Sequence, residues 1–240
     1  MRSLAARVYG VVRRPRTTFT AVVHAPSWAP VLAATTAVTF LCGVGFLRTD
    51  IGQQALVDQW ERTATAFGQA VDDQDYARMQ QTARNGNFDA LYAAATALAS
   101  GPLLVFIMSA LMFVVLRRRG AGAASRSRPS FVQVLAVVAY AGVILTLRQI
   151  IATPIDYVRE SIGSPTTLVQ LFSMLDEASA VARFLAIIDL FVLWWIVVLA
   201  IGLAVLYQRS TRTLALAFTG AYIVLALLAA LAMAVSGGTA

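Results

Sequence analysis

Two ionisable residues, Arg148 and Asp189, lie inside long apolar stretches of the chain. A charge at the centre of a bilayer costs on the order of 2.5 to 3.5 kcal/mol on insertion scales, so such residues are usually paired or turned toward other helices. Arg148 lies six residues before Pro154, and Asp189 lies six residues after Arg183. If both stretches are helices, the two charges lie about 9 Å from the same membrane surface, because each residue rises about 1.5 Å. This spacing predicts an ion pair or a shared water-filled dent.

A second reading keeps the two charges apart. Arg148 would extend outward to the membrane surface, and Asp189 would form hydrogen bonds near the N-terminus of its own helix. The sequence leaves both readings open.

Residues suited to catalysis are few. His24 and Cys42 are the only histidine and the only cysteine, and their positions along one helix do not allow a Cys–His pair within the chain. The sequence contains no Gly-x-x-x-x-Gly-Lys phosphate loop, no His-Glu-x-x-His zinc motif and no Gly-x-Ser-x-Gly elbow. Spacing alone leaves a serine and arginine or an aspartate-only chemistry open. We predict no catalytic residue, no cofactor and no enzymatic activity.

An acidic triplet, Asp72, Asp73 and Asp75, raises the question of calcium. An EF-hand loop needs a glycine at its sixth position and a glutamate at its twelfth, where this chain has Arg78 and Arg84. We therefore predict no metal site.

The composition indicates whether the protein folds in water or in a membrane. Of the 240 residues, 59% are hydrophobic and 13% are charged, whereas soluble domains carry about 25% charged residues. This excludes a water-soluble globule and a disordered chain, and a single cysteine excludes a disulfide scaffold. All 19 basic residues are arginine, which is typical of a GC-rich bacterial genome, and they are scattered between apolar runs rather than gathered for nucleic acid.

A hydrocarbon core about 30 Å thick requires about 20 apolar residues in a helix. Five runs meet this requirement, at about residues 28–47, 91–116, 131–153, 183–207 and 213–235. We predict an all-α polytopic membrane protein, a bundle of five transmembrane helices over residues 28–235. A basic N-terminal arm (1–27) precedes it and a short outer tail (236–240) follows it.

The arginines predict the orientation, because short arginine-rich segments stay in the cytoplasm. Residues 1–27 carry five arginines and no acid, and the second and fourth connections are also basic. The connections 48–90 and 154–180 each carry a net charge of −3. We expect a multi-pass protein of the bacterial cytoplasmic (inner) membrane, with its N-terminus inside and its C-terminus outside.

Several connections have helical periodicity of their own. In the arm, apolar residues recur at helical spacing among Arg2, Arg7, Arg13, Arg14 and Arg16, which suits a helix on anionic lipid headgroups or, equally, a mobile arm. An amphipathic helix is predicted by Leu56, Trp60, Ala64, Phe67 and Val71, and a short interfacial helix begins at Ser164 and Pro165. Residues 120–129 are interpreted as a flexible loop.

Other residues suit packing inside the bundle. Phe191, Trp195 and Gly202 share one helix face, with Trp194 beside them, and we expect them to pack rather than to bind a ligand. Gly101 and Pro102 predict a kink in the second span. Alanines at four-residue spacing allow close helix approach and leave a homo-oligomer or a membrane-protein partner open.

Three phrases give a family resemblance: Arg14-Pro15-Arg16-Thr17-Thr18-Phe19 before the first span, the segment from Ser130 to Tyr140, and Ile188-Asp189-Leu190-Phe191-Val192-Leu193-Trp194-Trp195 with Ile201-Gly202-Leu203. With five spans, the chain resembles the Yip-domain family (Ypt/Rab-interacting-protein-like membrane proteins), in particular its bacterial members. The resemblance implies a five-helix membrane domain without known catalysis. Eukaryotic relatives are associated with Rab-type GTPases, but the arm of 27 residues replaces their long cytoplasmic domain, so that partner is not carried over.

Two functions are compatible with these features. The first is a non-enzymatic protein that organises the membrane by binding lipids or membrane partners. The alternative is a small transporter or channel component with a polar path near Arg148 and Asp189. A water-filled cavity reaching the two charges would favour transport, whereas a closed apolar bundle would favour the first function.

Overall fold

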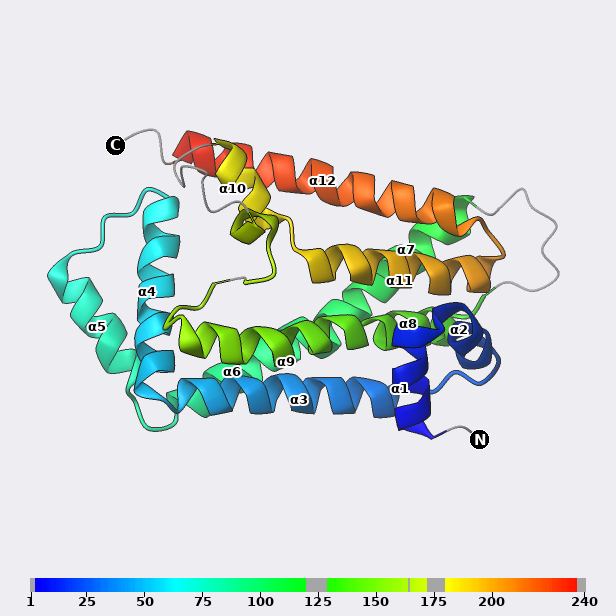
Figure 1. Cartoon of the computed structure of the whole chain (residues 1–240), viewed down its shortest axis with the longest axis horizontal. Coiled ribbons are helices and arrows are strands. Elements are labelled where there is room, and N and C mark those ends of the chain that lie inside the picture. Colours follow the sequence, from blue (N-terminus) through cyan, green and yellow to red (C-terminus); the bar gives the residue numbers. More distant parts are fainter. Residues whose placement is uncertain (1–2, 120–128, 164, 172–179, 237–240) are drawn as a thin grey trace. The chain divides into compact units, whose positions relative to one another are not determined.

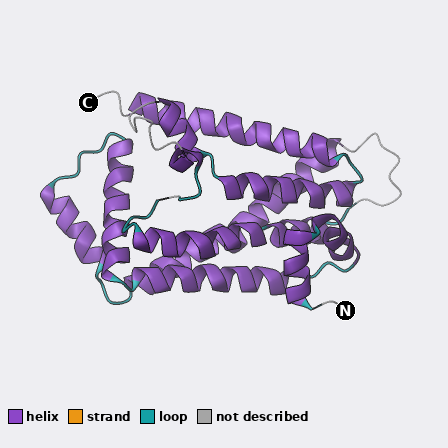
Figure 2. Cartoon of the chain, in the orientation of Figure 1, coloured by secondary structure: helices purple, strands orange, loops and turns teal. Residues whose placement is uncertain are grey.

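The described part of the chain is helical. The computed structural model describes residues 3–119, 129–163, 165–171 and 180–236. Within these ranges the only strand-like pairing is an isolated bridge between Thr167 and Asp189, and helices joined by loops account for the rest (Figure 2). The predicted all-α class is confirmed.

Five helical segments are long and apolar enough to cross a membrane, as predicted: Ala29–Leu47, Phe88–Arg117, Phe131–Val158, Leu190–Tyr207 and Thr211–Ala232. They are formed by α3 (Ala29–Leu47), α6 (Phe88–Leu98) continued through η1 (Ala99–Leu103) into α7 (Leu104–Arg119), α8 (Phe131–Ala141) with α9 (Val143–Val158), α11 (Leu190–Tyr207) and α12 (Thr211–Ser236) (Figure 1). The other elements are α1 (Leu4–Arg13), α2 (Pro15–His24), α4 (Asp50–Ala66), α5 (Asp73–Ala83), η2 (Leu168–Leu171) and α10 (Ala180–Ile187).

Two ends of the spans differ from the prediction. The fourth span begins at Leu190 and not near Arg183, because α10 ends at Ile187 and the backbone around Asp189 pairs with another segment. The third span continues through Pro154 to Val158. A proline removes one backbone hydrogen bond from a helix, but a membrane helix can continue past it when neighbouring groups compensate.

The chain divides into two compact units with opposite charge. The arginine unit comprises Met1–Val38, Ala97–Leu147 and Phe191–Thr219, and the acidic unit comprises Thr39–Thr96, Arg148–Leu190 and Gly220–Ala240. The arginine unit contains twelve arginines and no Asp or Glu, which gives a net charge of +12. The acidic unit contains the other seven arginines and all twelve acids, which gives −5. The two values add to the +7 of the whole chain.

In the arginine unit the N-terminal segment is part of the folded core. α1 and α2 pack against each other and against α8, and Val11, Phe19 and Val22 are completely buried. Gln133 Nε2 donates a hydrogen bond to the Val23 carbonyl at 3.1 Å. This packing contradicts the reading of residues 1–27 as a mobile arm and removes the expected boundary at residue 28.

Close packing at Gly202 joins three helices of this unit. A Cβ added at Gly202 would lie 2.6 Å from Val137 Cγ1 and 3.1 Å from the ring of Phe19. α11 therefore approaches α8 and α2 at a distance that only glycine allows. Of the four residues expected to pack together, Trp195 and Gly202 are buried, whereas Phe191 and Trp194 are half-buried with ring centroids 5.8 Å apart.

At the predicted kink the second span contains a π-helical turn, Ala99–Leu103. Pro102 lies inside this turn, and its missing N–H explains why the regular helical bonding is interrupted there. A Cβ at Gly101 would lie 2.7 Å from Thr36 Oγ1, so this turn packs closely against α3.

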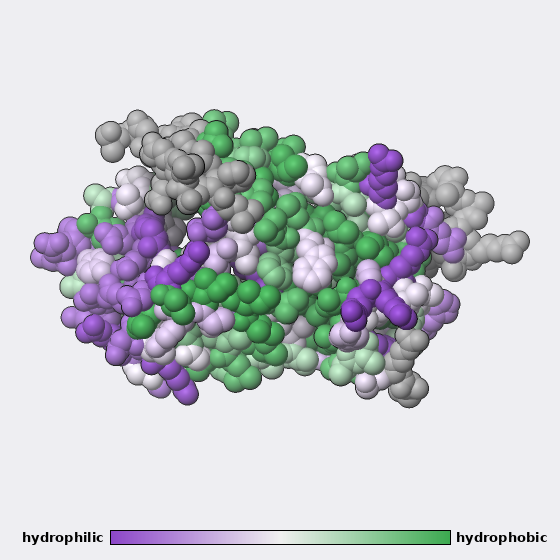
Figure 3. Space-filling model, viewed as in Figure 1, coloured by the Kyte–Doolittle hydropathy of each residue, from purple (hydrophilic) through white to green (hydrophobic). Residues whose placement is uncertain are grey.

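In the acidic unit, α4 and the ends of two spans share a core. Leu56 and Ala55 of α4 are buried with Phe46 and Leu47 of α3, and the ring of Trp60 lies 5.7 Å from that of Phe88. The amphipathic helix predicted to reach Val71 is shorter than expected, because α4 ends at Ala66 and Phe67 is exposed. Figure 3 shows hydrophilic residues gathered over α4 and α5.

The acidic triplet caps a helix. Asp72 is the N-cap of α5, and its Oδ1 accepts a hydrogen bond from the Asp75 N–H at 2.7 Å. Asp75 in turn pairs with Arg78 at 3.0 Å. Acidic side chains stabilise a helix N-terminus because they satisfy its free N–H groups and its dipole.

Gly202 provides a test of the packing in the arginine unit. We expect Gly202→Ala to lower the stability of the protein in detergent by about 1 to 3 kcal/mol, because the added Cβ overfills the contact with Val137. Gly220→Ala on α12 is the matched control, since nothing lies within 4 Å of its added Cβ. Thermal unfolding measures both, and a Gly202→Ala variant as stable as the Gly220→Ala variant would contradict the packing.

Candidate polar site of the acidic unit

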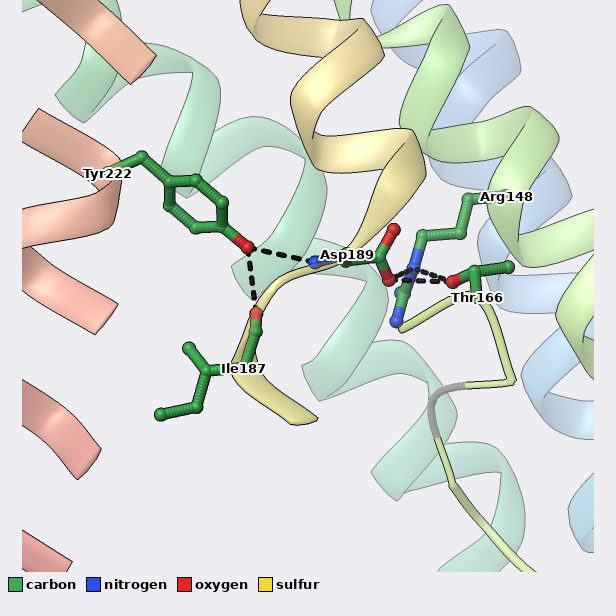
Figure 4. Close-up of polar contacts among 5 residues, drawn as sticks. All are labelled: Arg148, Thr166, Ile187, Asp189 and Tyr222. Atoms are coloured by element: carbon green, nitrogen blue, oxygen red, sulfur yellow. Dashed lines mark hydrogen bonds and ion pairs between the residues drawn. The ribbon is translucent and has the colours of Figure 1, made fainter. Parts of the chain in front are cut away.

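The structure brings Arg148 and Asp189 together. Arg148 comes from α9, and Asp189 immediately precedes the first residue of α11. Arg148 Nε lies 2.6 Å from Asp189 Oδ2 (Figure 4). The Asp189 side chain is 5% exposed and that of Arg148 is 27% exposed, so the carboxylate depends on this partner while the guanidinium keeps some access to its surroundings.

Thr166 completes the environment of the carboxylate. Its hydroxyl donates to Asp189 Oδ2 at 2.7 Å and accepts from Arg148 Nε at 3.3 Å. One carboxylate oxygen therefore receives a charged donor and a neutral donor. A buried ion pair is tolerated only when such additional hydrogen bonds compensate for the lost hydration.

The backbone around Asp189 is held by the same loop. Leu168 N–H donates to the Ile188 carbonyl at 2.8 Å, and Leu190 N–H donates to the Thr166 carbonyl at 3.0 Å. These bonds replace helical bonds and explain the break between α10 and α11. The negative charge of Asp189 also lies at the N-terminus of α11, where the helix dipole favours it.

Tyr222 of α12 contacts the break from another direction. Its hydroxyl donates to the Ile187 carbonyl at 2.8 Å and accepts from the Asp189 N–H at 3.1 Å (Figure 4). The site thus connects α9, the loop at Thr166, the break before α11, and α12. Its polar groups satisfy one another, which makes the arrangement a clasp between segments.

Sequence reasoning missed Thr166 and Tyr222. The position of Thr166 gave no signal, because a threonine in a loop is ordinary. Tyr222 did give one: it is a phenol in an otherwise apolar run, and a buried tyrosine hydroxyl usually finds a hydrogen-bond partner. The predicted interfacial helix at Pro165 is instead the short 3-10 turn η2, and Ser164 lies outside the described residues.

The basic residues of the N-terminal segment have different environments. Arg7 NH1 donates to Ser27 Oγ at 2.8 Å and to the Ala25 carbonyl at 3.3 Å. Arg13 donates to the Tyr9 hydroxyl at 3.0 Å. Arg14 and Arg16 are exposed, and Arg2 lies outside the described residues.

Comparison with known families agrees with this architecture. The family model described as the Yip1 domain matches residues 9–234, and the chain therefore belongs to the Yip1 domain family. The match begins inside α1, so the family domain includes most of the segment that the sequence prediction set apart as an arm. Searches of curated proteins and of solved structures gave no significant match.

Segments that suggested the family meet in the arginine unit. Phe19 comes from the first phrase, Val137 from the second and Gly202 from the third, and the contact at Gly202 joins them. These segments therefore contribute to a packing core.

A double-mutant cycle tests the clasp. Arg148→Gln or Asp189→Asn alone should each cost about 3 to 5 kcal/mol of stability, because each leaves a buried charge without its partner. The double variant should cost clearly less than the sum of the two, as measured by thermal unfolding in detergent. Arg78→Gln, which removes an exposed ion pair on α5 outside the clasp, is the control and should be additive with either. Additive losses for Arg148→Gln and Asp189→Asn would show that the charges do not depend on each other.

Proposed function

We propose that this protein is a non-enzymatic organiser of the bacterial cytoplasmic membrane, which binds anionic lipids and membrane partners. The proposal rests on the separation of charge between the two units. Every Asp and Glu of the sequence belongs to the acidic unit, and the arginine unit has twelve arginines and no acidic residue. Arginines close to an anionic membrane surface are attracted to the lipid headgroups, and each contributes about 1 kcal/mol of binding free energy.

The same separation supports an orientation. Arginine-rich segments stay in the cytoplasm during insertion, which favours a cytoplasmic location for residues 1–27 and for the basic connections after the second and fourth spans. The N-terminus would then lie inside and the C-terminus outside.

The exposed apolar surface supports contacts within the bilayer. Only 17% of the most apolar stretch of Phe88–Arg117 and 11% of that of Thr211–Ala232 are buried. Leu225, Leu228 and Leu231 of α12 are all more than half exposed. Such surfaces suit lipid chains or the helices of another membrane protein, including a second copy of this chain.

The environment of Asp189 favours organisation over transport. Its carboxylate is buried, and Arg148 and Thr166 already donate hydrogen bonds to Oδ2. An ion or solute passing this point would have to replace bonds that hold three segments together. The partial exposure of the Arg148 side chain, 27%, is the observation that keeps a small transporter as the second candidate.

Labelling of single cysteines tests the orientation. In a Cys42→Ala background, Asp73→Cys on α5 should react with a membrane-impermeant maleimide in intact cells. Arg212→Cys, in the first turn of α12, should react only after lysis. Both side chains are exposed, so access to the compartment decides the result. The reverse pattern would overturn the proposed orientation.

Reconstitution tests the function. In vesicles of phosphatidylcholine with a minor fraction of labelled phosphatidylglycerol, we expect the protein to enrich the anionic lipid around itself, measured by energy transfer from its tryptophans. The vesicles should not become permeable to small ions or amino acids. Permeability that Asp189→Asn abolishes, without lipid enrichment, would favour the transporter.

A further inference from the structure

A pocket lies between α1 and α2 on the side of α2 away from the core. It has a volume of about 360 Å³ and is lined by Arg7, Thr17, Thr20, Ala21 and His24. The four residues of α2 recur at helical spacing, so they share one face, whereas Phe19 and Val22 on the other face are buried. Its size falls within the range of about 300 to 1,000 Å³ typical of ligand pockets.

Arg7 brings a positive charge to this pocket. Its NH1 is held by Ser27 and Ala25, which fixes the guanidinium. Its Nε is buried and has no hydrogen-bond partner among the described residues. A buried donor without a partner is costly, and more so on a charged group. An anion bound to the part of the Arg7 side chain that lines the pocket would offset that cost by neutralising the guanidinium.

The acceptor must come from outside this unit. The arginine unit contains no Asp or Glu, so neither α1, α2 nor the neighbouring α8 can supply a carboxylate. None of the salt bridges formed by the described residues includes Arg7. An anion with several oxygens fits a guanidinium best, because the planar fork matches phosphate geometry.

The other lining groups present acceptors. The hydroxyls of Thr17 and Thr20 donate to the Arg14 and Arg16 carbonyls at 3.0 and 2.9 Å, which leaves their oxygen lone pairs available. His24 Nδ1 lies 2.7 Å from the Thr20 carbonyl, so Nδ1 is the donor and Nε2 of the neutral ring is an acceptor. A ligand that fits this set has a phosphate for Arg7 and hydroxyl groups for the acceptors.

The position of the pocket favours a lipid as the source of that phosphate. His24 ends α2, and the first span begins five residues later at Ala29. Five residues reach at most about 18 Å, so the pocket lies near the end of a transmembrane helix, where headgroups are found.

We propose that this pocket binds the headgroup of an anionic phospholipid that carries hydroxyl groups, such as phosphatidylglycerol. The phosphodiester lies against the Arg7 guanidinium, and the glycerol hydroxyls donate to the threonine oxygens and to His24 Nε2. The proposal rests on the proposed function, because it names the lipid class and the site through which the arginine unit holds the cytoplasmic leaflet.

Lipid titration monitored by native mass spectrometry tests this site. The detergent-solubilised full chain is titrated with phosphatidylglycerol, phosphatidic acid or phosphatidylcholine. We expect the binding order to follow that sequence, because phosphatidic acid lacks the headgroup hydroxyls and phosphatidylcholine lacks net charge. Arg7→Gln should weaken phosphatidylglycerol binding about tenfold. Arg16→Gln is the matched control: it removes the same charge from an exposed position outside the pocket and should change the affinity less than about twofold.

A second variant separates binding from folding. Thr20→Val removes a hydroxyl that donates a hydrogen bond within its own helix, to the Arg16 carbonyl, and it should reduce the preference for phosphatidylglycerol over phosphatidic acid. Arg7→Lys should restore part of the affinity lost in Arg7→Gln. Melting temperatures of all variants are compared with the unchanged protein, and Thr20→Val decides the result if Arg7→Gln does not fold.

Three outcomes would overturn the proposal. Equal losses for Arg7→Gln and Arg16→Gln would show diffuse attraction to charge, and unchanged preference in Thr20→Val would remove the role of the hydroxyls. Millimolar inorganic phosphate that binds alone and displaces phosphatidylglycerol would identify a site for free phosphate. The first outcome, with lipid enrichment in vesicles intact, would remove this pocket but keep the proposed function.

Discussion

The cost of bringing charge into hydrocarbon shapes this chain at several levels. It keeps the five spans poor in ionised residues. Arg148 inside the third span pairs at 2.6 Å with Asp189, which immediately precedes the fourth span. It also bears on the distribution of charged residues along the chain, since the acidic residues are confined to one unit and the other has an excess of arginine. Sorting by charge therefore acts both on the placement of whole segments and on single side chains.

The clasp around Asp189 shows how a broken helix is tolerated at this depth. Backbone groups freed by the break would be costly in lipid unless other groups satisfied them. Here the loop at Thr166 and the hydroxyl of Tyr222 supply bonds to residues 187–190. The polar groups thus compensate for irregular backbone, and the ion pair is one part of that compensation.

Much of this architecture could be predicted from the sequence, and the failures have physical causes. Length and hydropathy located the five spans, because the thickness of the bilayer determines how long an apolar helix must be. Arg148 and Asp189 were paired because both were expected at the same distance from the membrane surface. The break before Leu190 was missed because it depends on pairing with a loop more than twenty residues away. The packing of α1 and α2 was missed because arginines surround their apolar residues, and only the distant surfaces at Val137 and Gly202 explain why Phe19 is buried.

The contact at Gly202 has a consequence for biogenesis. Phe19 leaves the ribosome early, but the surfaces that bury it belong to residues more than a hundred positions later in the chain. At synthesis speeds of about 5 to 20 residues per second, roughly 10 to 40 s pass between the synthesis of α2 and that of α11. During that interval the part of α2 that packs against α11 is uncovered. The nascent chain therefore needs a temporary cover there, for which the lipid interface or an insertion factor is suited.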